Sequence, residues 1–103
     1  MENAVFIELK RRGKEVYYWK DKFGKEVDFL IKEGLKVKEL IQVCWDIEDS
    51  NIKKRELKGL LAACKEFKLK NGLIITEDKE GKETIDGKNI IYAPLWKWML
   101  EIK

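Results

Sequence analysis

The stretch GKEVDFLIKEGLKVKELIQVCWD, residues 24–46, decides the fold, because it holds two apolar runs separated by a glycine-containing turn. Residues 25–32 and residues 35–46 are rich in β-branched and other apolar side chains, as is typical of strands. A polar residue interrupts each run, Asp28 in the first and Gln42 in the second. A carboxylate in a strand otherwise suited to burial needs a partner. The two strands therefore indicate a candidate site as well as a fold.

The residues before this stretch predict a helix and a further strand. Residues 2–12 place apolar side chains at helical spacing, and Gly13 follows where a C-terminal cap is expected. Residues 15–20 are rich in Val, Tyr and Trp and are joined to residues 25–32 by the turn sequence DKFG. Three consecutive strands are therefore expected to form a meander.

The residues after this stretch predict a long amphipathic helix and a returning strand. Its apolar face repeats at helical spacing and consists of Leu57, Leu60, Leu61, Cys64 and Phe67. Asp49 or Ser50 is expected to cap its start, and Asn71-Gly72 is expected to mark its end. The strand at residues 73–76 should lie parallel to the strand at 35–46, because a long helix joins the two.

The C-terminal part predicts a hairpin about Asp86-Gly87 and a short helix from Pro94 that offers Trp96 or Trp98 to the core. The order of elements is therefore α-β-β-β-α-β, followed by a hairpin and a helix. This order predicts an α/β fold with a mixed sheet flanked by helices. Residues 1–103 are expected to form a single domain.

The amino-acid composition limits the kinds of protein to which this chain can belong. Of the 103 residues, 45% are hydrophobic and 40% are charged, which indicates a globular chain with the Lys and Glu excess of thermophilic proteins. The net charge of +3 is small, so nucleic-acid binding would need a local basic patch. No apolar run approaches the ~20 residues of a membrane span, so we expect a cytoplasmic protein without a membrane partner. Cys44 and Cys64 are expected to be reduced core residues, with a disulfide between them as the less favoured alternative.

The segment ENAVFIELKRRGKEVYYWKDKFGKEVDFLIKEG, residues 2–34, resembles the C-terminal domain that follows the ATPase module in many archaeal and bacterial AAA-type ATPases. The resemblance extends through KRELKGLLAA, LIIT and PLWKWML, and so covers nearly the whole chain. It implies the restriction-endonuclease-like fold of the PD-(D/E)XK nuclease superfamily. It also implies that residues 1–103 are a C-terminal fragment whose partner is the N-terminal ATPase module. No GxxxxGK[ST] loop occurs in the sequence, so this fragment is not expected to bind ATP.

The resemblance also implies a set of site residues. Nucleases of this superfamily use a Glu, an Asp and a D/E-x-K pair to hold a divalent ion and steady the developing charge. Glu8 and Asp28 match the first two positions, whereas Gln42 and Cys44 stand where the acid and the lysine are expected. Asp28 and Gln42 are then weak ligands for Mg²⁺ or Mn²⁺, since one lost charge costs ~4 kcal/mol at ~4 Å. A thiol cannot replace the ammonium group as a donor.

Simpler interpretations of these residues stay open. Glu8 can pair with Arg12 on one helix face, Gln42 can be a satisfied core amide, and Cys44 can be a small buried hydrophobe. The candidate nucleic-acid contacts are Lys10, Arg11, Arg12 and Lys20. A second basic run, residues 53–55, is expected to be a solvated helix face.

Three functions follow as hypotheses. The favoured one is a degenerate nuclease-like accessory domain of an ATPase that binds DNA with weak or no cleavage. The second is an active nuclease dependent on Mg²⁺ or Mn²⁺, using Glu8, Asp28 and Gln42 with Lys20 or Arg12 as a displaced basic residue. The third is a non-catalytic assembly domain of the ATPase.

Overall fold

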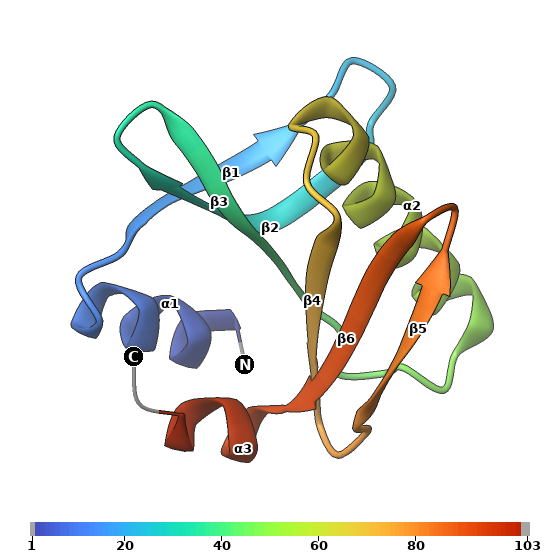
Figure 1. Cartoon of the computed structure of the whole chain (residues 1–103). Helices are drawn as coiled ribbons and strands as arrows, with labels where there is room; N and C mark the ends of the chain where they lie inside the picture. Colours follow the sequence, from blue (N-terminus) through green and yellow to red (C-terminus); the bar gives the residue numbers. More distant parts are fainter. Residues whose placement is uncertain (1, 102–103) are drawn as a thin grey trace.

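Six strands and three helices make up residues 2–101, the part of the chain that this computed structural model describes (Figure 1). In chain order they are α1 (Glu2–Arg11), β1 (Glu15–Lys20), β2 (Glu26–Glu33), β3 (Lys36–Val43), α2 (Ser50–Glu66), β4 (Asn71–Thr76), β5 (Gly81–Ile85), β6 (Lys88–Pro94) and α3 (Leu95–Leu100). The predicted α-β-β-β-α-β order, with a hairpin and a short helix after it, is confirmed.

The strands form one mixed sheet in the order β1-β2-β3-β4-β6-β5. The three N-terminal strands are antiparallel neighbours, as expected for a meander. β4 pairs in parallel with both β3 and β6, and β5 closes the far edge as the antiparallel partner of β6. Because β3 and β4 run in parallel, α2 serves as the crossover between them, as predicted.

The sheet is covered on both faces (Figure 1). α2 packs on one face over a cluster that includes Val27, Leu40, Cys44, Leu60 and Ile74. α1 and α3 lie on the opposite face over a cluster that includes Val5, Leu9, Phe29, Ile41 and Trp98. Leu40 and Ile41 therefore belong to different layers, as the alternation of side chains along a strand requires.

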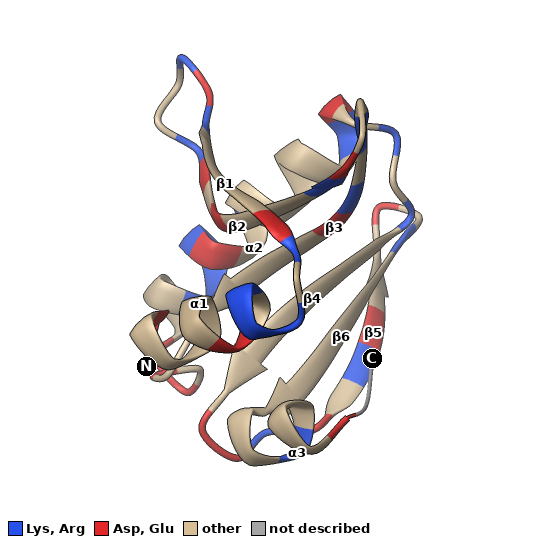
Figure 2. Cartoon of the chain, turned by 90° about the vertical axis from the view of Figure 1, so that its left-hand side faces the viewer, with Lys and Arg blue, Asp and Glu red and all other residues tan. Residues whose placement is uncertain are grey.

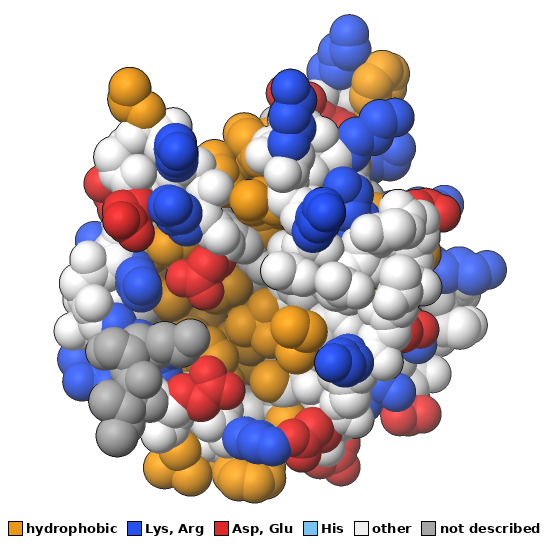
Figure 3. Space-filling model, in the orientation of Figure 1, with side chains coloured by type: hydrophobic (Ala, Val, Ile, Leu, Met, Phe, Trp, Pro, Cys, Tyr) orange, Lys and Arg blue, Asp and Glu red, His pale blue; other side chains and the backbone are white. Residues whose placement is uncertain are grey.

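The α1 face is incompletely covered over β4 and β6. Leu73, Ile91 and Ala93 from these strands line a hollow of about 350 Å³ together with Leu9 of α1. Figure 3 shows the hydrophobic side chains that floor this hollow between α1 and the C-terminal half of the sheet. Part of the apolar surface of the sheet is therefore left open beside α1.

The predicted third strand was too long at its C-terminal end. β3 stops at Val43, and the chain turns away after Cys44, whose backbone N–H still donates to the Ile75 carbonyl at 2.8 Å. A turn closed by the Asp49 N–H and the Asp46 carbonyl follows and leads into α2. Trp45 is consequently exposed in a loop.

The predicted end of the long helix was also wrong. α2 begins at the expected cap, where Asp49 Oδ1 accepts the backbone N–H groups of Asn51 and Ile52. It ends at Glu66, because Lys68 adopts a φ of 55° and the Leu69 N–H returns to the Cys64 carbonyl. Residues 71–72, expected at the helix end, are the first two residues of β4.

The remaining predictions on the fold agree with the structure. Asp86 and Gly87 form the β5–β6 turn with positive φ at both residues, as Asp-Gly hairpins require. Trp98, rather than Trp96, is the tryptophan that α3 places in the core. Cys44 and Cys64 are both buried and free. Within residues 2–101, no helix has the length and apolar character needed to cross a membrane.

Candidate functional site

β2 and β3 separate at one end, and two polar side chains fill the gap between them. Their ladder runs from Glu33–Lys36 to Phe29–Ile41 and includes no residue pair beyond that point. Past the last pair, Gln42 Oε1 accepts the backbone N–H of Asp28 at 2.8 Å, and Asp28 Oδ2 accepts the backbone N–H of Val43 at 2.8 Å. Asp28 and Gln42 therefore meet across the divergence of the two strands.

A bulge in β2 contributes to this arrangement. β1 pairs Tyr17 with Leu30 and Trp19 with Val27, so Tyr18 faces both Asp28 and Phe29. One extra residue on β2 shifts the alternation of side chains there, and such bulges commonly re-aim a side chain. Val27 accordingly packs on the α2 face and Phe29 on the α1 face.

The amide of Gln42 joins three elements. Its nitrogen donates to the backbone carbonyls of Glu26 in β2 and Glu56 in α2, at 2.9 and 3.0 Å. With the bond to Asp28, both amide protons and the amide oxygen have protein partners, and the side chain is only 1% exposed. The partners also fix the orientation of the amide, because two carbonyls require the nitrogen and one N–H requires the oxygen.

α2 comes very close to the sheet at this point. A β-carbon added to Gly59 would lie 2.2 Å from the Glu26 carbonyl oxygen and 3.1 Å from Gln42 Nε2. Only a residue without a side chain permits this approach. Gly59 therefore sets the depth at which the Glu56 carbonyl can reach Gln42.

Two carboxyl groups at this site have raised pKa values. Burial raises the pKa of Asp28 to about 6, opposed by the hydrogen bond from Val43, and the negative charges of Glu2 and Glu26 add to the rise. Burial, and then the charge of Asp28, raises the pKa of Glu56 to about 7. Carboxyl groups that share a confined site resist ionising together.

Cys44 lies next to this group but belongs to the core. It is buried on the α2 face beside Leu60 and Tyr92, and burial raises the pKa of its thiol to about 11. The side chain is therefore an uncharged thiol near neutral pH. It lies on the same face of the sheet as Gln42, and it supplies no charge to the site.

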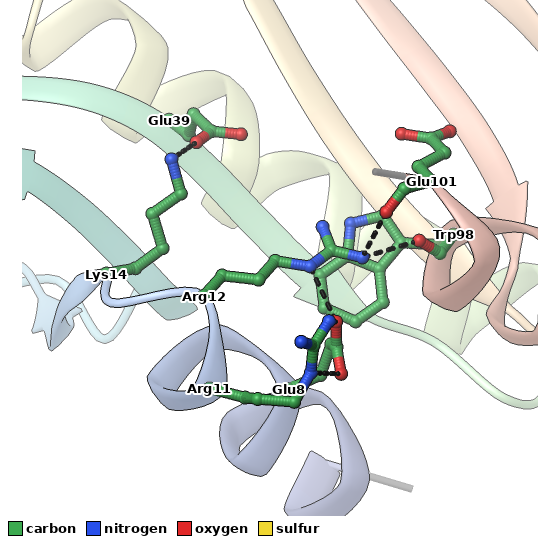
Figure 4. Close-up of polar contacts among 7 residues, drawn as sticks. All are labelled: Glu8, Arg11, Arg12, Lys14, Glu39, Trp98 and Glu101. Atoms are coloured by element: carbon green, nitrogen blue, oxygen red, sulfur yellow. Dashed lines mark hydrogen bonds and ion pairs between the residues drawn. The ribbon is translucent and has the colours of Figure 1, made fainter. Parts of the chain in front are cut away.

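Glu8 takes part in a different cluster, shown in Figure 4. It is buried on α1, where its carboxylate accepts two hydrogen bonds from Arg11 at 2.9 and 2.6 Å and one from Arg12 at 2.7 Å. These bonds, Arg11 first, lower the pKa of Glu8 to about 2. The pairing of Glu8 with Arg12 is thus confirmed.

Arg12 extends this cluster to the C-terminal helix. Its Nη2 donates to the carbonyls of Trp98 and Glu101, and its guanidinium carbon lies 4.4 Å from the centroid of the Trp98 ring (Figure 4). The side chain is only 4% exposed. The structure thus places Arg12 in the packing between α1 and α3, and not where a phosphate could reach it. Lys10, Arg11 and Lys20, the other expected nucleic-acid contacts, are exposed.

Asp28 opens onto a cleft of about 350 Å³ between the start of β2 and the first half of α2. Four cations line it, namely Lys25, Lys54, Arg55 and Lys58, together with Glu26, Glu56 and the ring of Phe23. None of the exposed α1 cations nor Lys20 lines this cleft. Among the residues that line the cleft, Asp28 therefore has four basic neighbours and two acidic ones.

Glu2 and Glu56 are acidic neighbours of Asp28 that the sequence interpretation missed. Six residues, or ~9 Å of helix, separate Glu2 from Glu8, so the Asp28 end and the arginine end of α1 are distinct. Glu56 could have been found, because it interrupts the sheet-facing positions of α2 between Ile52 and Leu60. A carboxylate within an apolar helix face is as unusual as one within an apolar strand.

The donors near Asp28 do not fit a divalent ion. Among residues 2–101, no three Asp, Glu, Cys or His side chains are placed to hold a metal together. The Gln42 oxygen and Asp28 Oδ2 each already accept a backbone N–H. The arrangement can close the gap between β2 and β3 and present a polar cleft.

Comparison with known proteins shows which family the chain belongs to. Over 110 aligned residues it is 46% identical to the "Uncharacterized protein MJ1544" of Methanocaldococcus jannaschii, an alignment that covers 97% of this chain. The aligned region is 24% of that relative, so the chain spans about a quarter of its length. The model of the family described as "Domain of unknown function (DUF4143)" matches residues 1–98, and the chain belongs to that family.

Proposed function

We propose that this domain is a nuclease-like module of the PD-(D/E)XK type that no longer cleaves and is retained to bind nucleic acid. We further propose that it acts as an accessory domain of a larger protein with an AAA-type ATPase module. The element order and the position of Asp28 at the strand divergence support the nuclease-like origin. The length of the relative, about four times the aligned region, is in keeping with a larger protein.

The hydrogen bonds of Gln42 are the main observation in support of the proposal that this domain no longer cleaves nucleic acid. Its Nε2 faces two backbone carbonyl oxygens, those of Glu26 and Glu56. A glutamate in the same place would put a carboxylate oxygen against both carbonyls and leave three acceptors without a proton. The surroundings of residue 42 are therefore suited to an amide, and unsuited to the acidic metal ligand that an active enzyme of this type would need.

The cleft beside Asp28 supports binding of a polyanion. Four cations line it against three carboxylates, and burial raises the pKa of Asp28 and Glu56 to about 6 and about 7. A fraction of the acidic groups is then neutral near pH 7, which leaves the cations in excess. Lys and Arg side chains gathered at a cleft are the usual contacts for phosphates.

Oligonucleotide binding at a series of salt concentrations tests this proposal. A fluorescein-labelled single-stranded DNA should bind with an affinity that falls as salt rises, because phosphate contacts release counterions. The variant Lys54→Ala/Lys58→Ala removes two cleft cations one helical turn apart and should reduce the salt slope by ~1.4 for single strands. Lys36→Ala/Lys38→Ala removes two exposed lysines outside this cleft and is the matched control.

Two outcomes would overturn the proposal. One is affinity that does not depend on salt or on the Lys54/Lys58 pair. The other is cleavage of the oligonucleotide that requires Mg²⁺ or Mn²⁺ and disappears in Asp28→Ala, which would make the domain an active nuclease.

The apolar hollow on the α1 face favours a second function, that of an assembly domain. Leu73, Ile91 and Ala93 leave apolar surface open in a hollow of about 350 Å³, and contiguous exposed apolar surface commonly marks a protein contact. Under this alternative, Ile91→Glu in the full-length protein lowers ATPase activity or changes its assembly, while oligonucleotide affinity of the isolated domain stays the same. Equal effects of Ile91→Glu on both measurements would instead indicate misfolding.

A further inference from the structure

Phe23 stands apart from the core at the tip of the β1–β2 hairpin. Its side chain is 77% exposed, although phenylalanine is among the residues most often buried. Figure 2 shows that the turn between β1 and β2 projects away from the body of the domain. Phe23 nevertheless lines the same cleft as Asp28, so its ring is displayed at the mouth of the candidate site.

The turn that carries Phe23 is held by Asp21. Asp21 Oδ1 accepts the backbone N–H groups of Phe23 and Lys25, at 2.9 and 2.8 Å. The Asp21 N–H donates to the Lys25 carbonyl at 2.8 Å, and Gly24 takes the positive φ, 87°, that this tight turn needs. The exposed ring therefore sits on a hydrogen-bonded turn, so the backbone that carries it needs little further ordering when a ligand binds.

The cations of the cleft are exposed, whereas two of its three carboxyl groups lie deeper. Lys25, Lys54, Arg55 and Lys58 form an exposed rim that also includes one carboxylate, Glu26, and Lys22 Nζ lies 5.4 Å from the centroid of the Phe23 ring. Asp28 and Glu56 are half-buried further in. A phosphate is attracted to the rim and repelled by the carboxyl groups, whereas an uncharged base with N–H donors is compatible with them.

We propose that Phe23 stacks on an unpaired base of a nucleic acid strand whose phosphates lie along the lysines of the cleft rim. The inference rests on the proposed function and specifies its substrate class, which is nucleic acid with unpaired bases rather than continuous duplex. A duplex turns its phosphates outward and keeps its bases stacked inside, so it offers the ring no free base face except at its ends. Stacking of a base on an aromatic ring is tolerant of sequence.

The test compares three probes of equal length on the 103-residue chain: an oligothymidylate, its abasic counterpart with the same phosphates, and a duplex whose two ends are closed by linkers without bases. Phe23→Ala should weaken binding of the oligothymidylate by about 5- to 150-fold, the effect of one lost stacking contact. It should leave the abasic strand and the duplex unchanged. Phe23→Trp should restore the affinity. Leu35→Ala is the matched control, because Leu35 is an apolar side chain that is 98% exposed at the β2–β3 turn, at the other end of β2.

The outcomes separate this inference from the proposed function. Equal effects of Phe23→Ala on all three probes, or no effect on any, overturn the stacking role while salt-dependent binding of the wild-type chain still supports nucleic-acid binding. Absence of binding to every probe at low salt overturns both. Circular dichroism of Phe23→Ala should match that of the wild-type chain, since the ring contributes to neither core cluster.

Discussion

Gln42 and Asp28 hold β2 and β3 together where their backbones no longer pair. The Gln42 side chain accepts the Asp28 backbone N–H, and the Asp28 side chain accepts the N–H of the residue that follows Gln42. Side chains thus supply two hydrogen bonds across the end of the β2–β3 pairing, where the backbone ladder supplies none. This exchange links the chemistry of residue 42 to the stability of the fold.

Gln42→Glu should therefore destabilise the domain at pH 7. It turns a donor that serves the Glu26 and Glu56 carbonyls into an acceptor, and an unsatisfied buried group costs about 1–3 kcal/mol, more when it is charged. The loss should shrink at pH 5, since a protonated carboxyl regains one donor. Urea unfolding at the two pH values measures this. Asn51→Asp, the same chemical change at the exposed start of α2, is the control, and equal effects of the two variants would contradict the described bonding.

Gly59→Ala should change the stability of the domain in two opposite ways, through helix propensity and through packing. Alanine favours a helix over glycine by about 0.5–1 kcal/mol, but the new β-carbon would lie 2.2 Å from the Glu26 carbonyl oxygen. A backbone atom cannot rotate away, so α2 must shift, at a cost of about 1–3 kcal/mol. We expect a net loss of stability in thermal unfolding. Lys58→Ala at the adjacent position should change it by less than about 0.5 kcal/mol, and a stabilised Gly59→Ala variant would contradict the close approach.

The raised pKa values of Asp28 and Glu56 predict that stability falls as pH rises. Both folded values, about 6 and about 7, lie above the ~4 expected in the unfolded chain. Their contribution is fully present below pH ~4 and is lost as pH rises through 6 and 7. Glu8 acts in the opposite sense: its pKa is lowered to about 2, so its contribution is lost only as pH falls toward 2. Unfolding free energies measured from about pH 4 to about pH 8 check this.

The variant Asp28→Asn/Glu56→Gln should flatten the dependence of stability on pH near neutrality. An asparagine at position 28 keeps an oxygen for the Val43 N–H, so the hydrogen bond across the divergence survives. Glu66→Gln changes an exposed carboxylate at the end of α2 and controls for charge. A double variant whose stability falls with pH as steeply as the wild type would show that other groups govern the dependence.

The regular elements could be predicted because their patterns are local. The alternating runs of β1 and β2 and the repeating apolar face of α2 are visible in the sequence, and the Asp86-Gly87 turn is specified by two residues. The two errors of extent arose where tertiary contacts decide. Lys68 takes a conformation usually left to glycine and ends α2 early. β3 loses its partner β2 after Ile41, continues beside β4 to Val43 and ends there.

The candidate site was only partly predictable for the same reason. Asp28 and Gln42 were visible as polar interruptions of apolar strands, and their proximity follows from antiparallel pairing. Alternation alone could not show that Gln42 Nε2 faces two carbonyls, one of them from α2. The choice between the two partners of Glu8, a metal site or arginines, depended on the direction in which α1 is rotated. In the structure the rotation of α1 places Glu8 against Arg11 and Arg12, and the Arg12 guanidinium lies 4.4 Å from the Trp98 ring.

Arg12 and Arg11 share one carboxylate but should differ sharply in their effect on stability. Arg12 is 4% exposed, donates to Glu8 and to the carbonyls of Trp98 and Glu101, and stacks on the Trp98 ring. Arg12→Ala removes all of these contacts and should cost about 3–5 kcal/mol, as expected when a buried ion pair loses one partner. Arg11 is 67% exposed, so Arg11→Ala should cost only a small fraction of that, as is usual for exposed ion pairs.

Urea unfolding of the two variants measures this difference, and Arg12→Lys refines it. A lysine keeps the charge but cannot donate in several directions at once or stack in the same plane, so it should recover less than half of the loss. High salt should reduce the effect of Arg11→Ala and leave that of Arg12→Ala nearly unchanged, because buried pairs are weakly screened. Equal losses of unfolding free energy in Arg11→Ala and Arg12→Ala would contradict this account. They would mean that the apolar contacts of Trp98 alone join α1 to α3.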